Sequence, residues 1–191
     1  MKSLLFETEE EIEIGPEAHD NQDKVDILLG LIKKNVDNSE KFIYSLNDCI
    51  YLDMPFGLKG TYSVTGGLVI RTLEIIDHAV ALNEAWGLNL DEKKLFFLAL
   101  IRSLPHGGFG DCAPKYIKTV KSTIRGGVAK WHKSPYYDYT INGAKVLEHL
   151  VEIGFTKSFY LIPLIMNTPK DKEFFCVLTA ETYVDNFLEK V

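Results

Sequence analysis

The sequence predicts an all-α domain with a long loop in its middle. Three observations support this fold class: many apolar residues recur at the three- and four-residue spacing of a helix, glycine or proline ends several of these runs, and residues 105–138 lack the period. The 191 residues are 46% hydrophobic, which suffices for one sizeable core but not comfortably for two. We therefore expect one helical domain over residues 21–191, preceded by a short irregular acidic segment over residues 1–20.

The N-terminal segment is distinguished by its charge. Seven of the fourteen residues from Glu7 to Asp20 are acidic, and their mutual repulsion disfavours a helix there. Within this segment, glutamate and isoleucine alternate over residues 11–14 with the two-residue period of a strand. We expect an extended conformation at this end of the chain.

Two helices should open the domain. The first is predicted over residues 21–38 because its apolar side chains fall on one face: Val25, Leu28, Leu29, Ile32 and Val36. The second should cover residues 39–46, with Ser39 as its N-cap. Residues 48–67 contain Pro55 and four glycines and should be irregular.

Five further helices are expected. One covers residues 65–86 and ends at Gly87, a common helix terminator. The next begins at Asn89 or Asp91 and stops at Pro105, which cannot continue a helix. The others span residues 140–153, 157–166 and 172–190. The stretch 105–138 should be mostly loop, with a short helix at 116–123.

Composition excludes several classes of function. A formal charge of −6 and a pI near 5.4 argue against general nucleic-acid binding, which usually requires a basic domain. No run approaches the roughly 18 apolar residues that span a bilayer, and the N-terminus lacks the apolar core of a secretory signal. The three cysteines form no CxxC pair and are expected to be reduced thiols. These features favour a cytoplasmic protein without a membrane partner.

Five motifs follow one another between residues 45 and 191. They are GGLV at 66–69, LALI at 98–101 followed by Leu104, INGAKVLEHL at 141–150, LIPLIMNTP at 161–169 and LTAETYVDNFLEKV at 178–191. In this order they resemble the HD-domain family of metal-dependent phosphohydrolases, particularly the small nucleotide-acting members of bacteria and their phages. The resemblance implies a helical fold in which histidine and aspartate side chains from several helices hold metal ions.

At the ligand positions this chain differs from the family. The resemblance places Arg71 where the first histidine stands, and Arg102 with Ser103 where the histidine-aspartate pair stands. Asn142 and Asn167 occupy the positions of later histidines. Glu181 follows Ala180 in the closing helix and keeps a carboxylate.

These replacements change the chemistry that the resemblance implies. Arginine stays protonated and has no lone pair to donate to a metal, so we expect no bound metal, no other cofactor, no catalytic residue and no hydrolysis. Two guanidinium groups restore the positive charge of a lost dication and offer paired donors to phosphate oxygens. Such a pocket should retain a phosphorylated ligand without cleaving it.

A basic stretch lies within the predicted loop. No acidic residue stands between Cys112 and Tyr137, while six basic residues do: Lys115, Lys118, Lys121, Arg125, Lys130 and Lys133. This stretch can focus positive potential on a ligand, with Trp131 and nearby tyrosines as stacking surfaces for a base. His78, seven residues after Arg71, and His106, just after Arg102, could line the same pocket.

Each of these residues also has an ordinary structural interpretation. Arg71 could pair with Glu74 or Asp77 on its own helix, and Arg102 could favourably meet the C-terminal end of its helix dipole. Basic stretches are often solvated faces, and single histidines are often ordinary surface or core residues.

The leading functional hypothesis is a catalytically inactive HD-like protein. It would bind and sequester, or sense, a phosphorylated small molecule such as a nucleotide or cyclic oligonucleotide, for example as a phage anti-defence sponge in the host cytoplasm. One alternative is a protein-interaction module, or one that associates with itself, whose pocket has decayed. Another is a residual hydrolase with a relocated metal site at His106 and Asp111.

Overall fold

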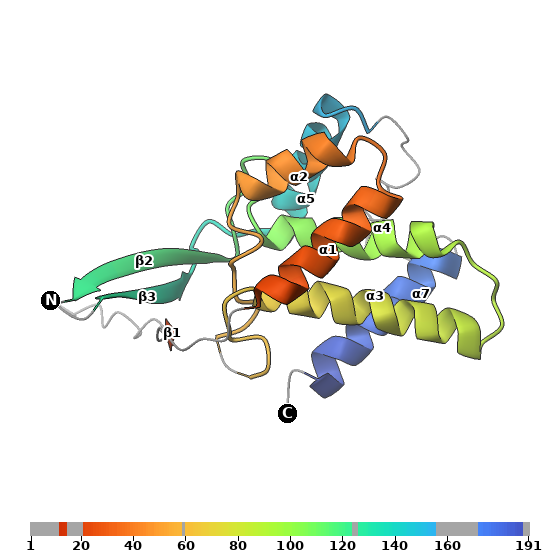
Figure 1. Cartoon of the computed structure of the whole chain (residues 1–191), viewed down its shortest axis with the longest axis horizontal. Coiled ribbons are helices and arrows are strands. Elements are labelled where there is room, and N and C mark those ends of the chain that lie inside the picture. The colour runs from red at the N-terminus through yellow and green to blue at the C-terminus, as the bar shows by residue number, and fades with distance from the viewer. Residues whose placement is uncertain (1–11, 15–20, 59, 124–125, 156–171, 189–191) are drawn as a thin grey trace, which may run out of the picture.

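The computed structural model describes residues 12–14, 21–58, 60–123, 126–155 and 172–188 (Figure 1). The helices within these ranges are α1 (Gln22–Asn35), α2 (Ser39–Asn47), α3 (Gly67–Ala85), α4 (Glu92–Ser103), α5 (Tyr139–Glu152) and α7 (Lys172–Tyr183). A 3-10 turn, η1 (Leu104–His106), follows α4, and a π-helical turn, η3 (Val184–Leu188), follows α7. Except for the short helix expected at 116–123, the predicted helices in these ranges are confirmed, and the structure is mostly helical. The helix predicted at 157–166 lies outside the described residues.

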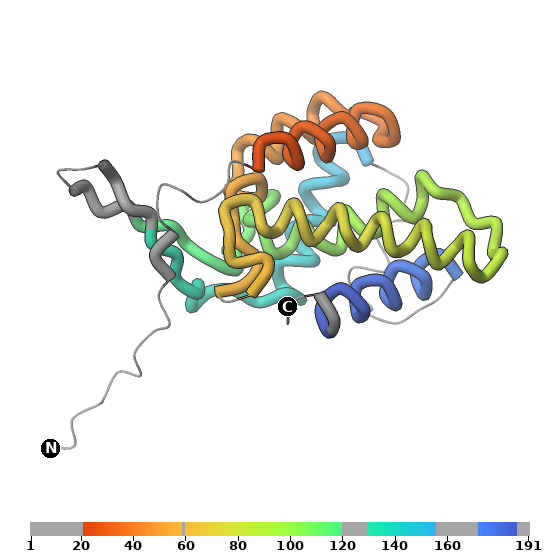
Figure 2. The backbone as a smooth tube through the Cα atoms, turned by 60° about the horizontal axis from the view of Figure 1, so that its bottom comes forward, coloured from red at the N-terminus to blue at the C-terminus, as the bar shows by residue number. Residues whose placement is uncertain are grey.

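The helices form layers around one core. Helices α3 and α4 lie side by side in the middle, α1 and α2 lie on one side of them, and α7 crosses both from the other side (Figures 1 and 2). Because α4 is covered on all sides, every residue from Lys94 to Ser103 is buried. A helix that is apolar around most of its circumference is typical of such a central position.

The middle of the chain is a β-ribbon, so the prediction of a loop with a short helix at 116–123 was wrong. Strands β2 (Tyr116–Thr123) and β3 (Gly126–Lys133) pair antiparallel, with Tyr116 opposite Lys133. Strand-favouring β-branched residues occur throughout β2. Their interleaving with lysines resembled a solvated loop, which is why the strands were missed. The ribbon of β2 and β3 projects from the helical body (Figure 1).

The acidic N-terminal segment contributes the third strand. Strand β1 (Ile12–Ile14) pairs antiparallel with β3 and places Glu13 opposite Lys130, giving the order β1-β3-β2. The strand expected from the alternation at residues 11–14 is thus confirmed.

Helix starts are determined by local chemistry. Asp91 caps α4 as expected, since its side chain accepts a hydrogen bond from the Lys93 amide at 2.9 Å. Ser39 was wrongly predicted as the cap of α2: it is the first helical residue, and Asn38 precedes it with a left-handed backbone (φ 57°).

None of the described helices is long and apolar enough to cross a bilayer.

The start of α3 is packed tightly against the preceding loop. A Cβ added at Gly67 would lie 2.0 Å from the Tyr62 carbonyl oxygen, so only glycine fits there. The same carbonyl accepts a hydrogen bond from the Phe56 amide at 3.0 Å. This contact fixes Phe56 and Tyr62 next to the first turns of α3, where Arg71 lies.

Candidate functional site

Arg71 of α3, Arg102 of α4 and Glu181 of α7 meet between the three central helices. Arg71 Nη2 lies 3.0 Å from Glu181 Oε1, and Arg102 Nη2 lies 2.6 Å from Glu181 Oε2. Both arginines are buried, with exposed fractions of 1% and 6%. Three positions that the HD-domain resemblance assigns to metal ligands therefore converge, and a shared carboxylate lies between the two guanidinium groups.

A second carboxylate, Asp185 of η3, completes this arginine–carboxylate cluster. Its two oxygens accept hydrogen bonds from Arg71 Nε at 2.7 Å and Nη2 at 2.8 Å. This parallel pair is the geometry by which guanidinium groups bind carboxylates and phosphates. The Asp185 side chain is 35% exposed, whereas that of Glu181 is 12% exposed. Asp185 is therefore the solvent-facing member of the cluster.

The cluster keeps Arg71 charged. Burial acts to lower the pKa of its guanidinium group, but the hydrogen bonds that Arg71 donates to Asp185 and the charges of Glu181 and Asp185 outweigh burial and raise it. Arg71 Nη1 is also buried, and among the described residues it has no hydrogen-bond partner. One donor of Arg71 is thus left over after both carboxylates are satisfied.

Phe56 brings a further cation to the cluster. Arg71 Cζ lies 4.0 Å from the centroid of the Phe56 ring, and Lys115 Nζ lies 3.7 Å from the same centroid. Lys115 Nζ also donates a hydrogen bond to the Phe56 carbonyl oxygen at 3.0 Å. Lys115, a predicted site residue, thus reaches the surroundings of Arg71.

His106 is a neutral histidine beside these cations. Burial, together with the nearby charges of Arg71, Lys115 and Arg102, lowers its pKa well below the usual value. Burial also raises the pKa of Tyr137, so the Tyr137 hydroxyl keeps its proton. That hydroxyl lies 2.6 Å from His106 Nδ1, and the tautomer of the imidazole decides which of the two groups donates the hydrogen bond.

Ser103 and Asn142 hold the surrounding core together. Ser103 Oγ donates a hydrogen bond to the Leu100 carbonyl oxygen at 2.6 Å and lies 2.5 Å from the Tyr51 hydroxyl. The Asn142 amide donates to the carbonyl oxygens of Pro105 and Ala113 at 2.8 Å and 2.6 Å. These hydrogen bonds fix the chain on both sides of His106.

The other predicted site residues lie elsewhere or have different partners. His78 Nδ1 is 2.8 Å from the Glu74 carbonyl oxygen, and its ring packs on Tyr183. Lys118 Nζ lies 5.5 Å from the Trp131 ring centroid. Trp131 is only 1% exposed, so the expectation that it offers a stacking surface is wrong. Arg125 and Asn167 lie outside the described residues.

The alternative interpretation in which Arg71 pairs on its own helix is wrong. Arg71 pairs with Glu181 and Asp185 on α7 and η3, not with Glu74 or Asp77 on its own helix. Glu74 instead accepts a hydrogen bond from the Tyr62 hydroxyl. Because α7 packs across α3, the carboxylates of Glu181 and Asp185 lie within hydrogen-bond distance of Arg71, although they are 110 and 114 residues away in the sequence.

Within the residues that the structure describes, no three histidine, cysteine, aspartate or glutamate side chains are grouped so that they could hold a metal ion. At the cluster itself, the donor set consists of two guanidinium groups and two carboxylates. The guanidinium groups have no lone pairs and repel a cation. Both carboxylates are engaged by the guanidinium groups.

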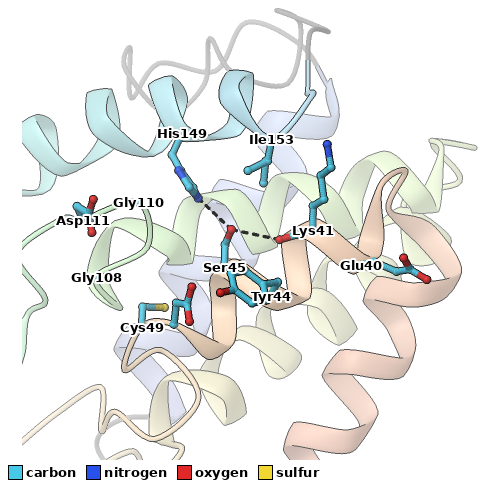
Figure 3. A pocket seen from close by; sticks show the side chains of 11 residues that line it. Glu40, Lys41, Tyr44, Ser45, Cys49, Gly108, Gly110, Asp111, His149 and Ile153 are labelled. Carbon is cyan, nitrogen blue, oxygen red and sulfur yellow. Dashed lines mark hydrogen bonds between the residues drawn. The ribbon is translucent and has the colours of Figure 1, made fainter.

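A cavity of about 540 Å³ lies away from the cluster, between α2, α5 and the turn at residues 107–111 (Figure 3). Its lining includes Ser45 and Cys49, His149, Gly110 and Asp111. Sequence reasoning gave this region no role, because Ser45 and His149 are 104 residues apart and belong to no shared motif.

No model of a protein family, no curated protein and no solved structure matches the chain. The likeness to HD-domain proteins therefore stays a prediction from the sequence motifs.

Proposed function

We propose that this protein is a non-hydrolysing, HD-like binder of a phosphorylated small molecule, a nucleotide or cyclic oligonucleotide. It holds the ligand's phosphate at Arg71 and so sequesters or senses the molecule. The observation that carries the proposal is the carboxylate of Asp185, which is held by two parallel hydrogen bonds on Arg71. A phosphate accepts the same pair of donors.

Asp185 is the member of the cluster that a ligand can replace. It is the more exposed of the two carboxylates, and it lies on a π-helical turn after the end of α7. Its displacement uncovers the Nε and Nη2 donors of Arg71 that now bind it. Glu181 stays in place and continues to hold Arg102.

The charge that remains favours a phosphate. With Asp185 displaced, the charges of Arg71, Arg102 and Lys115 are opposed by those of Glu181 and of Glu74, which accepts a hydrogen bond from Tyr62. The surplus of cations offsets the negative charge of the ligand, and burial strengthens the attraction. No residue of the cluster supplies an activated water, because a guanidinium group does not lower the pKa of a bound water as a metal does.

Equilibrium dialysis tests this proposal. The protein is dialysed against a panel of nucleotides and cyclic dinucleotides, with and without manganese, and the retained material is identified by chromatography and mass spectrometry. We expect at least one member of the panel to be retained uncleaved in both conditions. Retention of none refutes the proposal, and manganese-dependent cleavage favours a hydrolase with a relocated metal site.

A second candidate function, a protein-interaction or self-associating module, is favoured by the ribbon. It projects from the helical body, β2 is an edge strand of the described sheet, and Ile117 on it is 40% exposed. Edge strands readily accept a further strand from another chain. Sedimentation velocity of wild type and Ile117→Asp tests this second function. A change in association state caused by the substitution supports a protein-interaction or self-associating module.

A further inference from the structure

The cavity in Figure 3 contains a chain of hydrogen-bonding side chains from two helices. His149 points from α5 toward Ser45 on α2, and its Nε2 lies 2.9 Å from Ser45 Oγ. On the other side of the ring, Nδ1 lies 3.3 Å from Glu152 Oε2. A hydroxyl, an imidazole and a carboxylate in this sequence have the geometry of an activated nucleophile.

The hydrogen-bond pattern determines which tautomer of neutral histidine fits. Glu152 has only acceptors, so Nδ1 must carry the proton to avoid facing it with a lone pair. Nε2 is then the acceptor, and Ser45 Oγ donates to it. Ser45 Oγ has a second acceptor, the Lys41 carbonyl oxygen at 3.1 Å, but pairing with that group leaves Nε2 unsatisfied in this tautomer. Neutral His149 is therefore arranged as a base toward Ser45.

The turn at residues 107–111 forms the wall beside His149. A Cβ added at Gly110 would lie 2.7 Å from His149 Cβ, so the backbone of the turn approaches the imidazole more closely than any other residue type allows. Gly108 and Gly110 both have positive φ, at 81° and 66°, and both line the cavity. At Gly110 the turn thus presents backbone, without a side chain, to the imidazole of His149.

From this geometry we infer that Ser45 is a nucleophile for acyl transfer, with His149 as its general base and Glu152 as a positioning residue. Ser45 Oγ attacks the carbonyl carbon of an ester while His149 Nε2 takes the hydroxyl proton. The alcohol leaves with that proton, and water then cleaves the acyl-serine to a free acid and regenerates the hydroxyl. This site is separate from the arginine–carboxylate cluster and does not depend on its function.

The charges at the cavity indicate the class of substrate. Three carboxylates line it, those of Glu40, Asp48 and Asp111, against one lysine, Lys41. A negative potential disfavours anionic acyl groups. We expect a small uncharged or cationic ester, which the cavity of about 540 Å³ can hold.

Cys49, which also lines the cavity, is a weaker nucleophile. Burial raises the pKa of its thiol to about 11, so it stays protonated near neutral pH, and the thiolate is the reactive form. Its Sγ donates a hydrogen bond to the Leu46 carbonyl oxygen at 3.3 Å.

A fluorophosphonate probe tests the assignment, since Ser45 Oγ displaces fluoride to form a P–O bond while His149 takes the proton. Intact mass and peptide mapping should find one adduct on Ser45 in the full chain. Ser45→Ala should abolish it, and His149→Gln should slow it by about 100-fold, within the range contributed by a general base. Ser63→Ala, a substitution of a half-buried serine that does not line the cavity, should label as wild type does.

Glu152→Gln tests whether Glu152 positions the imidazole of His149 or has only a structural role. We expect it to slow labelling several-fold and to change the pH profile of the labelling rate relative to wild type. Circular dichroism melts confirm that each variant is folded. The inference is overturned if Ser45 in the folded wild type is not labelled, or if folded His149→Gln is labelled at the wild-type rate.

Discussion

Buried charge is the dominant feature at the scale of single residues. Arg71 and Arg102 are removed from water, and each depends on Glu181, which accepts from both guanidinium groups. Removing one member of a buried ion pair costs more than the pair contributes, because the remaining charge is left without compensation. Glu181 is therefore the residue whose loss should affect folding most.

Substituting Glu181→Gln should lower the free energy of unfolding by about 3–5 kcal/mol, since it leaves two buried guanidinium groups with the single carboxylate of Asp185. Urea denaturation followed by circular dichroism measures this. Glu148→Gln is the matched control, because Glu148 is exposed on α5, and it should change stability by less than about 0.5 kcal/mol. An equal effect of the two substitutions contradicts the shared role of Glu181.

His106 should make stability dependent on pH. Its pKa in the folded protein is lowered well below 6.5, so below that value the unfolded chain binds a proton that the folded chain does not. This contribution to stability is present above the unfolded pKa near 6.5 and is lost progressively as the pH falls below it. Urea denaturation at pH 7.5, 6 and 5 should show this loss in wild type and a smaller one in His106→Gln. Equal losses in both proteins exclude His106 as the source.

At the scale of elements, the sequence predicted what depends on local periodicity. The central helices were located from their apolar spacing and from the residues that end them, Gly87 and Pro105. Both signals are local, because they depend on residues that are close together in the sequence. The ribbon was missed because its strands are stabilised by pairing with each other and with residues 12–14. Such pairing is nonlocal, and alternation with lysines concealed it.

Replacing two helical glycines, Gly30 and Gly67, by alanine should change the stability of the protein in opposite directions. Gly30 in α1 has no atom within 4 Å of an added Cβ, so Gly30→Ala should stabilise the protein by about 0.5–1 kcal/mol through lower backbone entropy of the unfolded chain. Gly67→Ala forces a Cβ against the Tyr62 carbonyl oxygen and should destabilise by at least about 2–3 kcal/mol. Thermal melts of both variants measure the difference, and a Gly67→Ala protein as stable as wild type contradicts the packing at the start of α3.

At the scale of the whole molecule, packing of α7 across α3 and α4 creates the site. The positions of Arg71 and Arg102 were predicted from motifs, and their convergence follows from the layered arrangement. Asp185 was not predicted, because no sequence pattern indicates that a side chain 114 residues away reaches Arg71. The cavity at Ser45 and His149 was missed for the same reason.

Asp185→Asn tests whether a phosphate of the ligand replaces the Asp185 carboxylate on Arg71. Asparagine removes the competing charge and one of the two acceptors. Hydrogen bonds to charged groups contribute about 1.5–3 kcal/mol, so nucleotide affinity should rise by about tenfold or more. Arg71→Gln removes the guanidinium donors and should abolish binding.

Calorimetric titration of wild type, Asp185→Asn and Arg71→Gln with a panel of nucleotides and cyclic dinucleotides is the most direct measurement. We expect nucleotide binding to wild type, binding at least about tenfold tighter to Asp185→Asn, and none to Arg71→Gln. Exchange of Asp185 for a phosphate is contradicted if neither wild type nor folded Asp185→Asn gives heat, or if all three proteins bind with equal affinity.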